Sequence, residues 1–407
     1  MDEREPSPLR WYVAGLLCAA STLNYLDRQA LSVLAETIQK ALHLSTSDYS
    51  FITSAFLFSY TAMYAVSGRI VDWMGNRRGY PLFVSLWSFA DILHGLARTA
   101  SQLTFFRVLL GAAEPGNFPA GLRAVSEWFP VRERALGVGI FNSGTALGSA
   151  VAAPIVSFIA LSFGWQSAFV FTGMLGFIWV AAWLLFYRYS GGPPGEQAAS
   201  LVKPAALSKL AVIPAMWGCV LARVLTDPIS YFLFFWIPKY LQQERGFNLA
   251  DVGKYGWIPY AALTLGNLFS GAMPRWLIAR GWPLNRARKS TMLVISCLMP
   301  IFYMLVTRAP NPAWALAAIS VCMFGHAAWG NVILPAEVFP DHAVGTVTGI
   351  GGACGGLTGA LSQLAIGWIV THQSFAPVFA ACAMLYLVAF ACVHWLIGEL
   401  GVIRSVE

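Results

Sequence analysis

Charged side chains are scarce in this sequence. Of its 407 residues, 11% are Asp, Glu, Lys or Arg, while 57% are hydrophobic, and the mean hydropathy is +0.62. An average soluble domain carries about 25% charged residues. The composition therefore excludes an ordinary soluble enzyme and predicts a protein that crosses a membrane several times.

The sequence also lacks the motifs of catalysis and of metal or phosphate binding. It contains no cluster of metal ligands, no nucleophile paired with a base, no phosphate loop and no long soluble domain. Its seven cysteines all fall within apolar stretches, which suggests neither a disulfide nor a metal site. We expect no enzymatic activity, no cofactor and no bound metal. We also expect no cleavable signal peptide, because the first apolar stretch is too long for one.

Apolar stretches of about 20 residues follow one another along the chain, each long enough to cross ~30 Å of hydrocarbon as a helix. They lack the strict alternation of a membrane β-barrel. The sequence therefore predicts an all-α polytopic membrane protein with twelve transmembrane helices. These begin near residues 11, 49, 79, 101, 134, 164, 209, 252, 290, 312, 343 and 374.

The formal net charge is +7. Its distribution indicates membrane topology rather than a nucleic-acid partner, because Lys and Arg concentrate in the segments that are cytoplasmic if both termini lie inside. We therefore expect cytoplasmic termini and no binding of nucleic acid.

The chain divides into two repeats. The one long polar, Gly- and Pro-rich break predicts a cytoplasmic linker, residues 190–208, between six-helix bundles at 1–189 and 209–407. The motif EWFP at Glu127 recurs as EVFP at Glu337, an offset of 210 residues. Repeats of this kind predict a substrate cavity near the membrane midplane, where the two bundles meet.

Two charges interrupt the apolar stretch SQLTFFRVLLGAAEPGNFPAG. Arg107 and Glu114 are seven residues apart, so on a helix they share a face about two turns apart. A lone charge near the middle of a membrane costs at least ~2.5–3.5 kcal/mol, so such residues usually face a bundle interior or a water-filled cavity. The stretch therefore predicts a substrate or ion path.

The first apolar stretch carries Asp27 and Arg28. Because the first and fourth helices run in opposite directions, Arg28 and Arg107 should lie at similar depth in the outer half of the membrane. Two guanidinium groups at one level form a site for an anion. In the alternative interpretation, Asp27 and Arg28 neutralise partners and only hold helices together.

The segment GRIVDWMGNRRG needs a tight turn between the second and third helices, which its glycines permit. Asp72 can cap the next helix or pair with an arginine across the cytoplasmic face, which suits a conformational latch. The candidate gating residues are Gly68, Asp72, Gly75, Arg77 and Arg78.

Other polar groups lie at the depth of the expected cavity. Tyr60 offers a hydroxyl, although it is equally consistent with ordinary packing. Arg223 and Asp227 stack four residues apart, as a buried ion pair or with Asp227 contacting substrate. Asp91 and His94 share a helix face and have no assigned role beyond mutual hydrogen bonding. Further candidate substrate contacts are Asn142, Ser143, Trp329 and Asn331.

GRIVDWMGNRR resembles the signature between helices 2 and 3 of the major facilitator superfamily. NYLDR, FFRVLLGAAEPGNFPA and WFPVRERALGVGIFNSG resemble its anion:cation symporter family, and specifically the bacterial hexuronate transporters, which carry galacturonate and glucuronate with protons. The resemblance implies that Asp27 and Glu114 couple transport to protons, that Arg28 and Arg107 bind the substrate carboxylate, and that Tyr60 lines the site.

These patterns predict a proton symporter of the bacterial inner membrane that acts as a monomer within the lipid bilayer. Binding of a sugar acid to the arginines withdraws them from the carboxylates, whose protonation becomes easier. An aldonate, hexarate or other organic anion would use the same charges. An efflux antiporter for cations is disfavoured by the arginines, and a sensor without transport is a remaining alternative.

Overall fold

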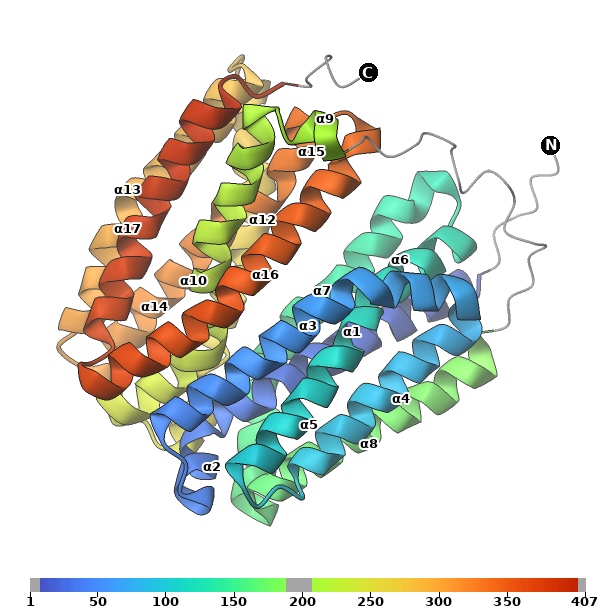
Figure 1. Cartoon of the computed structure of the whole chain (residues 1–407), viewed down its shortest axis with the longest axis vertical. Coiled ribbons are helices and arrows are strands. Elements are labelled where there is room, and N and C mark those ends of the chain that lie inside the picture. The colour runs from blue at the N-terminus through green and yellow to red at the C-terminus, as the bar shows by residue number, and fades with distance from the viewer. Residues whose placement is uncertain (1–7, 188–206, 402–407) are drawn as a thin grey trace. The chain divides into compact units, whose positions relative to one another are not determined.

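The computed structural model describes residues 8–187 and 207–401, and these residues form an all-helical chain (Figure 1). Each of the predicted spans coincides with one helix or with consecutive helices. Seven helices in the described ranges are long and apolar enough to cross a membrane by length and composition alone. The predicted all-α membrane fold is confirmed.

The described residues separate into two compact units. One contains those within 1–44, 55–201 and 249–257, and the other those within 45–54, 202–248 and 258–407. The predicted linker, 190–208, lies almost entirely outside the described residues, so the division into 1–189 and 209–407 stays a prediction.

The first unit consists of the helices coloured blue to green in Figure 1. It also includes α11, which comes later in the chain. The second unit also includes the first residues of α3. The helices up to α8 are α1 (Arg10–Val33), α2 (Ala35–Leu42), α3 (Thr46–Met74), α4 (Asn76–His94), α5 (Ala100–Ala113), η1 (Glu114–Gly116), α6 (Asn117–Trp128), η2 (Val131–Glu133), α7 (Arg134–Phe163) and α8 (Trp165–Phe186).

The later helices carry the second repeat. They are α9 (Leu207–Leu210), α10 (Pro214–Arg245), α11 (Leu249–Tyr255), α12 (Ile258–Ala279), α13 (Leu284–Arg308), α14 (Pro312–Ala328), η3 (Asn331–Ile333), α15 (Leu334–Val338), α16 (Asp341–His372), α17 (Ala376–Cys392) and the π-helical turn η4 (Val393–Ile397).

Helix pairing repeats between the two halves. In the first unit α1 packs on α7 and α4 on α8, and in the second α10 packs on α16 and α13 on α17. A third corresponding pair is α3 with α5 in the first half, joined by a hydrogen bond from Ser59 to the carbonyl of Val108, and α12 with α14 in the second. This agreement supports the internal duplication inferred from the recurring motif.

The duplicated motif ends a helix in the same way in each half. After α6 the chain becomes extended at Phe129, and after α15 at Phe339. A proline follows each phenylalanine, and the residue before a proline is driven out of the helical region of backbone space. The motif therefore terminates the fourth and tenth predicted spans for the same steric reason.

Glycines bring α7 close to α1. A Cβ at Gly144 would meet the carbonyl oxygen of Cys18, and one at Gly148 would meet that of Thr22. Because backbone atoms cannot move aside cheaply, only glycine allows this approach. The close contact holds α1, which carries two of the candidate charges, against the rest of the first unit.

The span predicted from residue 252 was wrong as a single helix. It consists of α11, a break at Gly256 and Trp257, and then α12. Pro259 occupies the first turn of α12, where its missing N–H costs nothing, so it starts a new helix rather than continuing the old one.

Candidate functional site

An ion pair joins α1 to the break after α5. Arg28 donates from Nε and Nη2 to Oε2 of Glu114, at 2.9 and 2.6 Å. The side chains are 10% and 0% exposed, respectively. Pro115, which follows Glu114, has no N–H to donate, and the chain there adopts a short 3-10 turn. The carboxyl group therefore projects from an irregular turn rather than from a regular helix.

Aromatic rings surround the guanidinium of Arg28. It lies 4.8 Å from the ring centroid of Tyr25, 4.7 Å from that of Tyr60 and 5.5 Å from that of Phe56. Such contacts stabilise a cation by about 0.5–2 kcal/mol, with the larger values where water is excluded. The rings therefore offset part of the cost of removing this charge from water.

Arg107 on α5 meets the same aromatic group. Its guanidinium lies 5.7 Å from the ring centroid of Phe56, and the residue is 1% exposed. The charge of Arg107 acts on the carboxyl groups of Asp27 and Glu114. The structure thus gathers both predicted arginines around one ring, although Arg107 is the more deeply buried in this conformation.

A glycine makes that arrangement possible. A Cβ at Gly111, one helical turn after Arg107, would lie 2.5 Å from the carbonyl oxygen of Phe56 and 3.2 Å from the Cβ of Ser59. Real side chains do not tolerate such contacts with backbone. Gly111 therefore lets α5 and α3 approach until the ring of Phe56 reaches both arginines.

Asp27 lies on a different side of α1 from Arg28, since neighbours on a helix point about 100° apart. It is 0% exposed and within hydrogen-bonding reach of Asp91 on α4. The predicted mutual hydrogen bond between Asp91 and His94 is not the principal contact. Instead, His94 Nδ1 binds the carbonyl of Ala90 at 2.7 Å, and Thr172 contacts Asp91 at 2.5 Å.

Sequence reasoning named Tyr60 for its hydroxyl and missed Tyr25 and Phe56 as aromatic partners of Arg28. Tyr25 precedes it by three residues, which places the two side chains on one face of α1. Phe56 and Tyr60 are four residues apart and share a face of α3. These spacings were visible in the sequence, but which helix would face Arg28 was not.

In the second unit, Asp227 accepts from Arg223, with Oδ2 2.8 Å from Nη2 and 2.9 Å from Nε. Asn331 donates to Thr226 Oγ1 at 2.7 Å and approaches Asp227 Oδ1 at 3.4 Å. A Cβ at Gly355 would collide with the Asp227 carboxyl group. The predicted ion pair is confirmed, and Asn331 belongs to the same polar group.

Trp329 lies inside the second unit. It is 1% exposed and donates from Nε1 to Ser296 Oγ at 2.8 Å, with the ring of Tyr386 edge-on at 6.2 Å. His326 binds the hydroxyl of Tyr386 at 2.8 Å. Protein covers nearly the whole indole ring, so this position does not support the predicted contact with substrate.

The polar groups predicted on α7 are accessible. Asn142 and Ser143 are exposed. Ser143 Oγ donates to the carbonyl of Ile140 at 2.7 Å and lies 3.6 Å from the sulfur of Cys18. Ser143 therefore satisfies its hydrogen locally and retains lone pairs for a ligand donor.

The predicted latch segment contains an ion pair that the sequence left open. Arg123 on α6 binds Asp72 Oδ1 and Glu127 Oε1, at 3.0 and 2.8 Å. Asp72 thus pairs with an arginine rather than capping α4. Gly75 adopts φ +74°, a backbone conformation that favours glycine, at the start of α4. Gly68 on α3 packs near Pro119 on α6.

The exposed Arg77 and Arg78 begin α4 at this end of the unit. Nearby, the hydroxyl of Tyr187 donates to Glu127. Burial and the negative charge of Glu127 raise the pKa of Tyr187, so the phenol keeps its proton and remains a donor.

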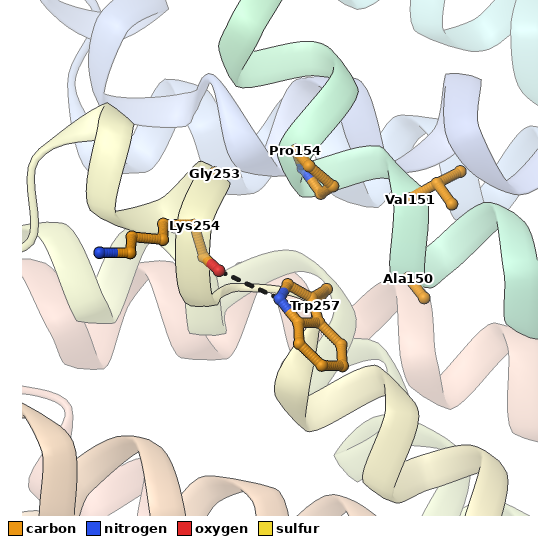
Figure 2. A pocket seen from close by; sticks show the side chains of 6 residues that line it. All are labelled: Ala150, Val151, Pro154, Gly253, Lys254 and Trp257. Carbon is orange, nitrogen blue, oxygen red and sulfur yellow. Dashed lines mark hydrogen bonds between the residues drawn. The ribbon is translucent and has the colours of Figure 1, made fainter.

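A groove of about 490 Å³ lies between α7 and the α11 region (Figure 2). It is lined by Ala150, Val151, Pro154, Gly253, Lys254 and Trp257, and Trp257 Nε1 donates to the carbonyl of Lys254 at 3.0 Å. These six residues include none of the charged groups around Arg28. We therefore place the candidate site at the charged group and not at this groove.

A repeated set of apolar membrane helices with charges buried among them defines a transport protein of the membrane. The model of the Major Facilitator Superfamily matches residues 17–362, and the chain belongs to that family. It is accordingly a transporter and not an enzyme.

Two relatives align with most of the chain. The chain is 31% identical to the hexuronate transporter of Escherichia coli (strain K12), over 96% of this chain and 94% of the relative. It is 34% identical to the galacturonate transporter of Dickeya chrysanthemi, over 65% of this chain and 81% of the relative. The resemblance noted in the sequence is confirmed.

The fold has a solved counterpart. A bacterial homologue of the human lysosomal transporter Spinster superposes with a TM-score of 0.75, covering 96% of this chain and 95% of the other, at 19% identity. This similarity concerns the fold alone.

Proposed function

We propose that this transporter imports a sugar-acid anion together with protons by alternating access, and that the anion is a hexuronate such as galacturonate or glucuronate. A relative that aligns with 96% of the chain is a hexuronate transporter, and one that aligns with 65% of it is a galacturonate transporter. The observation that carries the proposal is the buried ion pair between Arg28 and Glu114. A carboxylate already occupies the position that a substrate carboxylate would take.

Substrate binding is an exchange of carboxylates. Arg28 is held by the rings of Tyr25, Phe56 and Tyr60, so its guanidinium keeps its position when its partner leaves. A planar guanidinium binds an incoming carboxylate through two parallel hydrogen bonds. Arg107, behind the same Phe56 ring, adds positive charge to the site.

Proton coupling follows from this exchange. Glu114 remains ionised while Arg28 holds it, and burial then disfavours its charge once substrate takes Arg28 away. Glu114 therefore takes up a proton as substrate binds, and by linkage the proton strengthens substrate binding. Asp27 is the second proton-coupling carboxyl group in this proposal.

The sugar hydroxyl groups need hydrogen-bond partners. We assign this role to Asn142 and Ser143 in the first unit, where Tyr60 lines the site through its ring. In the second unit we assign it to Asp227 and Asn331. Trp329 was predicted as a substrate contact, and its burial makes it the weakest member of the set.

Gating is proposed for the latch segment of Gly68, Asp72, Gly75, Arg77 and Arg78, with Arg123 as the partner of Asp72. An exposed ion pair contributes only about 0–1 kcal/mol to stability, so it can break and reform during each cycle. In this proposal the protein lies in the bacterial inner membrane with both termini in the cytoplasm.

The test is uptake by proteoliposomes with and without an inward proton gradient. For Glu114→Gln we expect loss of accumulation above the external concentration, while exchange of labelled for unlabelled substrate survives, because the neutral amide mimics the protonated carboxyl. Glu244→Gln, an exposed change at the end of α10, is the control and should behave as wild type.

Undiminished uphill accumulation by Glu114→Gln would overturn the coupling mechanism. Competition by aldonates or hexarates but not by hexuronates would replace the substrate and retain the mechanism. Proton movement opposite to substrate movement would indicate an antiporter.

A further inference from the structure

Two buried carboxyl groups lie in the same unit as Arg28 and Glu114. Asp27 on α1 and Asp91 on α4 are both 0% exposed and within hydrogen-bonding reach of each other. Both oxygens of Asp27 and Oδ1 of Asp91 are buried without a hydrogen-bond partner among the described residues. Buried carboxyl oxygens without donors are costly.

We propose that Asp91 is a proton-binding residue of this transporter, and that Asp27 and Asp91 hold one proton between them. The inference deepens the proposed function, on which its transport role rests. A shared proton turns one carboxyl into a donor to the other and supplies the hydrogen bond that the pair lacks. Two carboxyl groups that share a buried site do not both stay ionised.

The charges around the pair support one resident proton. Three carboxyl groups, those of Asp27, Asp91 and Glu114, lie with two guanidinium groups, those of Arg28 and Arg107. Arg28 is paired with Glu114. The charge of Arg107 therefore balances only one of the two carboxyl groups of Asp27 and Asp91. One proton on the pair makes the buried group neutral, which is the arrangement that desolvation favours.

Thr172 on α8 leaves one oxygen of Asp91 for the shared proton. Its Oγ1 donates to Asp91 Oδ2 at 2.5 Å. Oδ1 of Asp91 is buried with no partner among the described residues, so it is the oxygen that shares the proton with Asp27.

His94, one turn after Asp91, is the competing proton acceptor. Its Nδ1 donates to the carbonyl of Ala90, while Nε2 is buried with no partner in the described part of the chain. The imidazole stacks on Phe169, with centroids 5.4 Å apart. A charged imidazole needs an acceptor at both nitrogens, so the ring is neutral and the proton goes to the carboxyl pair.

The proton can be detected without any substrate. In infrared spectra of the purified protein at neutral pH, we expect a carboxylic-acid C=O band that disappears in Asp91→Asn as well as in Asp27→Asn. Removing either acid leaves two carboxylates and two guanidiniums, so no proton is needed. In Thr172→Val the band should shift in frequency, because Asp91 loses a hydrogen-bond donor, while Thr172→Ser should leave it unchanged.

Transport adds a second readout. In Asp91→Asn, Asp27 has lost the neighbouring acid that favours its protonated form, and Arg107 favours its charge. The pH profile of uphill uptake should therefore move to lower pH by about one unit or more. Exchange should survive, which reports a folded protein.

An unchanged infrared band in Asp91→Asn would place the proton on Asp27 alone and overturn the inference. Absence of the band from the wild type would indicate a charged His94 and overturn it too. The proposed function fails separately, through sugar-acid uptake and Glu114→Gln, neither of which the infrared measurement requires.

Discussion

Arg28 shows how one buried charge becomes usable for binding. Its guanidinium is 10% exposed, forms two hydrogen bonds to Glu114 and lies over three aromatic rings. The hydrogen bonds belong to a partner that can be exchanged, whereas the rings stay in place. The residue is thus stable when paired with Glu114 and also when paired with a ligand.

Tyr60 tests whether the ring or the hydroxyl matters. We expect Tyr60→Phe to transport with a KM close to wild type, because the ring over Arg28 remains. Tyr60→Leu should raise KM by about 2- to 30-fold, the equivalent of the ~0.5–2 kcal/mol of a cation–π contact. The measurement is the concentration dependence of exchange, with the exposed Tyr12→Leu as control. An equal defect in Tyr60→Phe would assign the contact to the hydroxyl instead.

At the scale of elements, the position of α1 depends on α7. Gly144 and Gly148 face backbone carbonyl oxygens of α1, so the distance between the helices is set by the absence of two Cβ atoms. The break at Glu114 and the close approach of α5 to α3 at Gly111 act similarly. Backbone contacts, rather than large apolar side chains, thus determine where Arg28 and Glu114 meet.

Two alanine substitutions on α7 separate close packing from helix propensity. A Cβ at Gly148 meets the backbone of Thr22, whereas a Cβ at Gly139 meets nothing within 4 Å. We expect Gly148→Ala to destabilise the protein by about 1–3 kcal/mol through overpacking. Gly139→Ala should be neutral or stabilise by up to about 1 kcal/mol. Thermal unfolding in detergent measures both, and equal melting temperatures would contradict the close contact.

At the scale of the whole molecule, the two repeats share their helix pairing and their motif but not their charges. The first unit concentrates the candidate arginines and carboxyl groups, while the second contributes the pair Arg223 and Asp227 with Asn331. Coupling to protons is therefore a property of one repeat in our proposal, and the other repeat supplies neutral and paired groups.

Ligand binding should stabilise the whole fold. A true substrate at 100 times its Kd adds about 2.7 kcal/mol to the free energy of unfolding. We expect galacturonate or glucuronate to raise the Tm of the purified protein, and galactose, which lacks the carboxylate, to leave it unchanged. Arg28→Ala should abolish the shift. A shift with galactose equal to that with galacturonate would remove the carboxylate from the recognition mechanism.

The membrane helices, the repeats and two of the charged residues could be predicted from the amino-acid sequence. Apolar runs identify membrane helices, and the recurrence of Glu127 and its motif at Glu337 identifies the repeats, because both are local patterns. Arg107 and Glu114 stood out because charge is expensive in hydrocarbon. The single helix expected from residue 252 failed, since Pro259 restarts the chain as a new helix.

The sequence by itself determined the class of fold, the family and the short set of charged residues, since these depend on composition and on spacing along one chain. Only the tertiary structure decided their partners: that Arg28 holds Glu114, that Asp27 meets Asp91, that Asp72 meets Arg123 and that Trp329 is buried. The physical reason is that spacing fixes the face of a helix but not the helix it faces. That choice is made by packing between segments far apart in the chain.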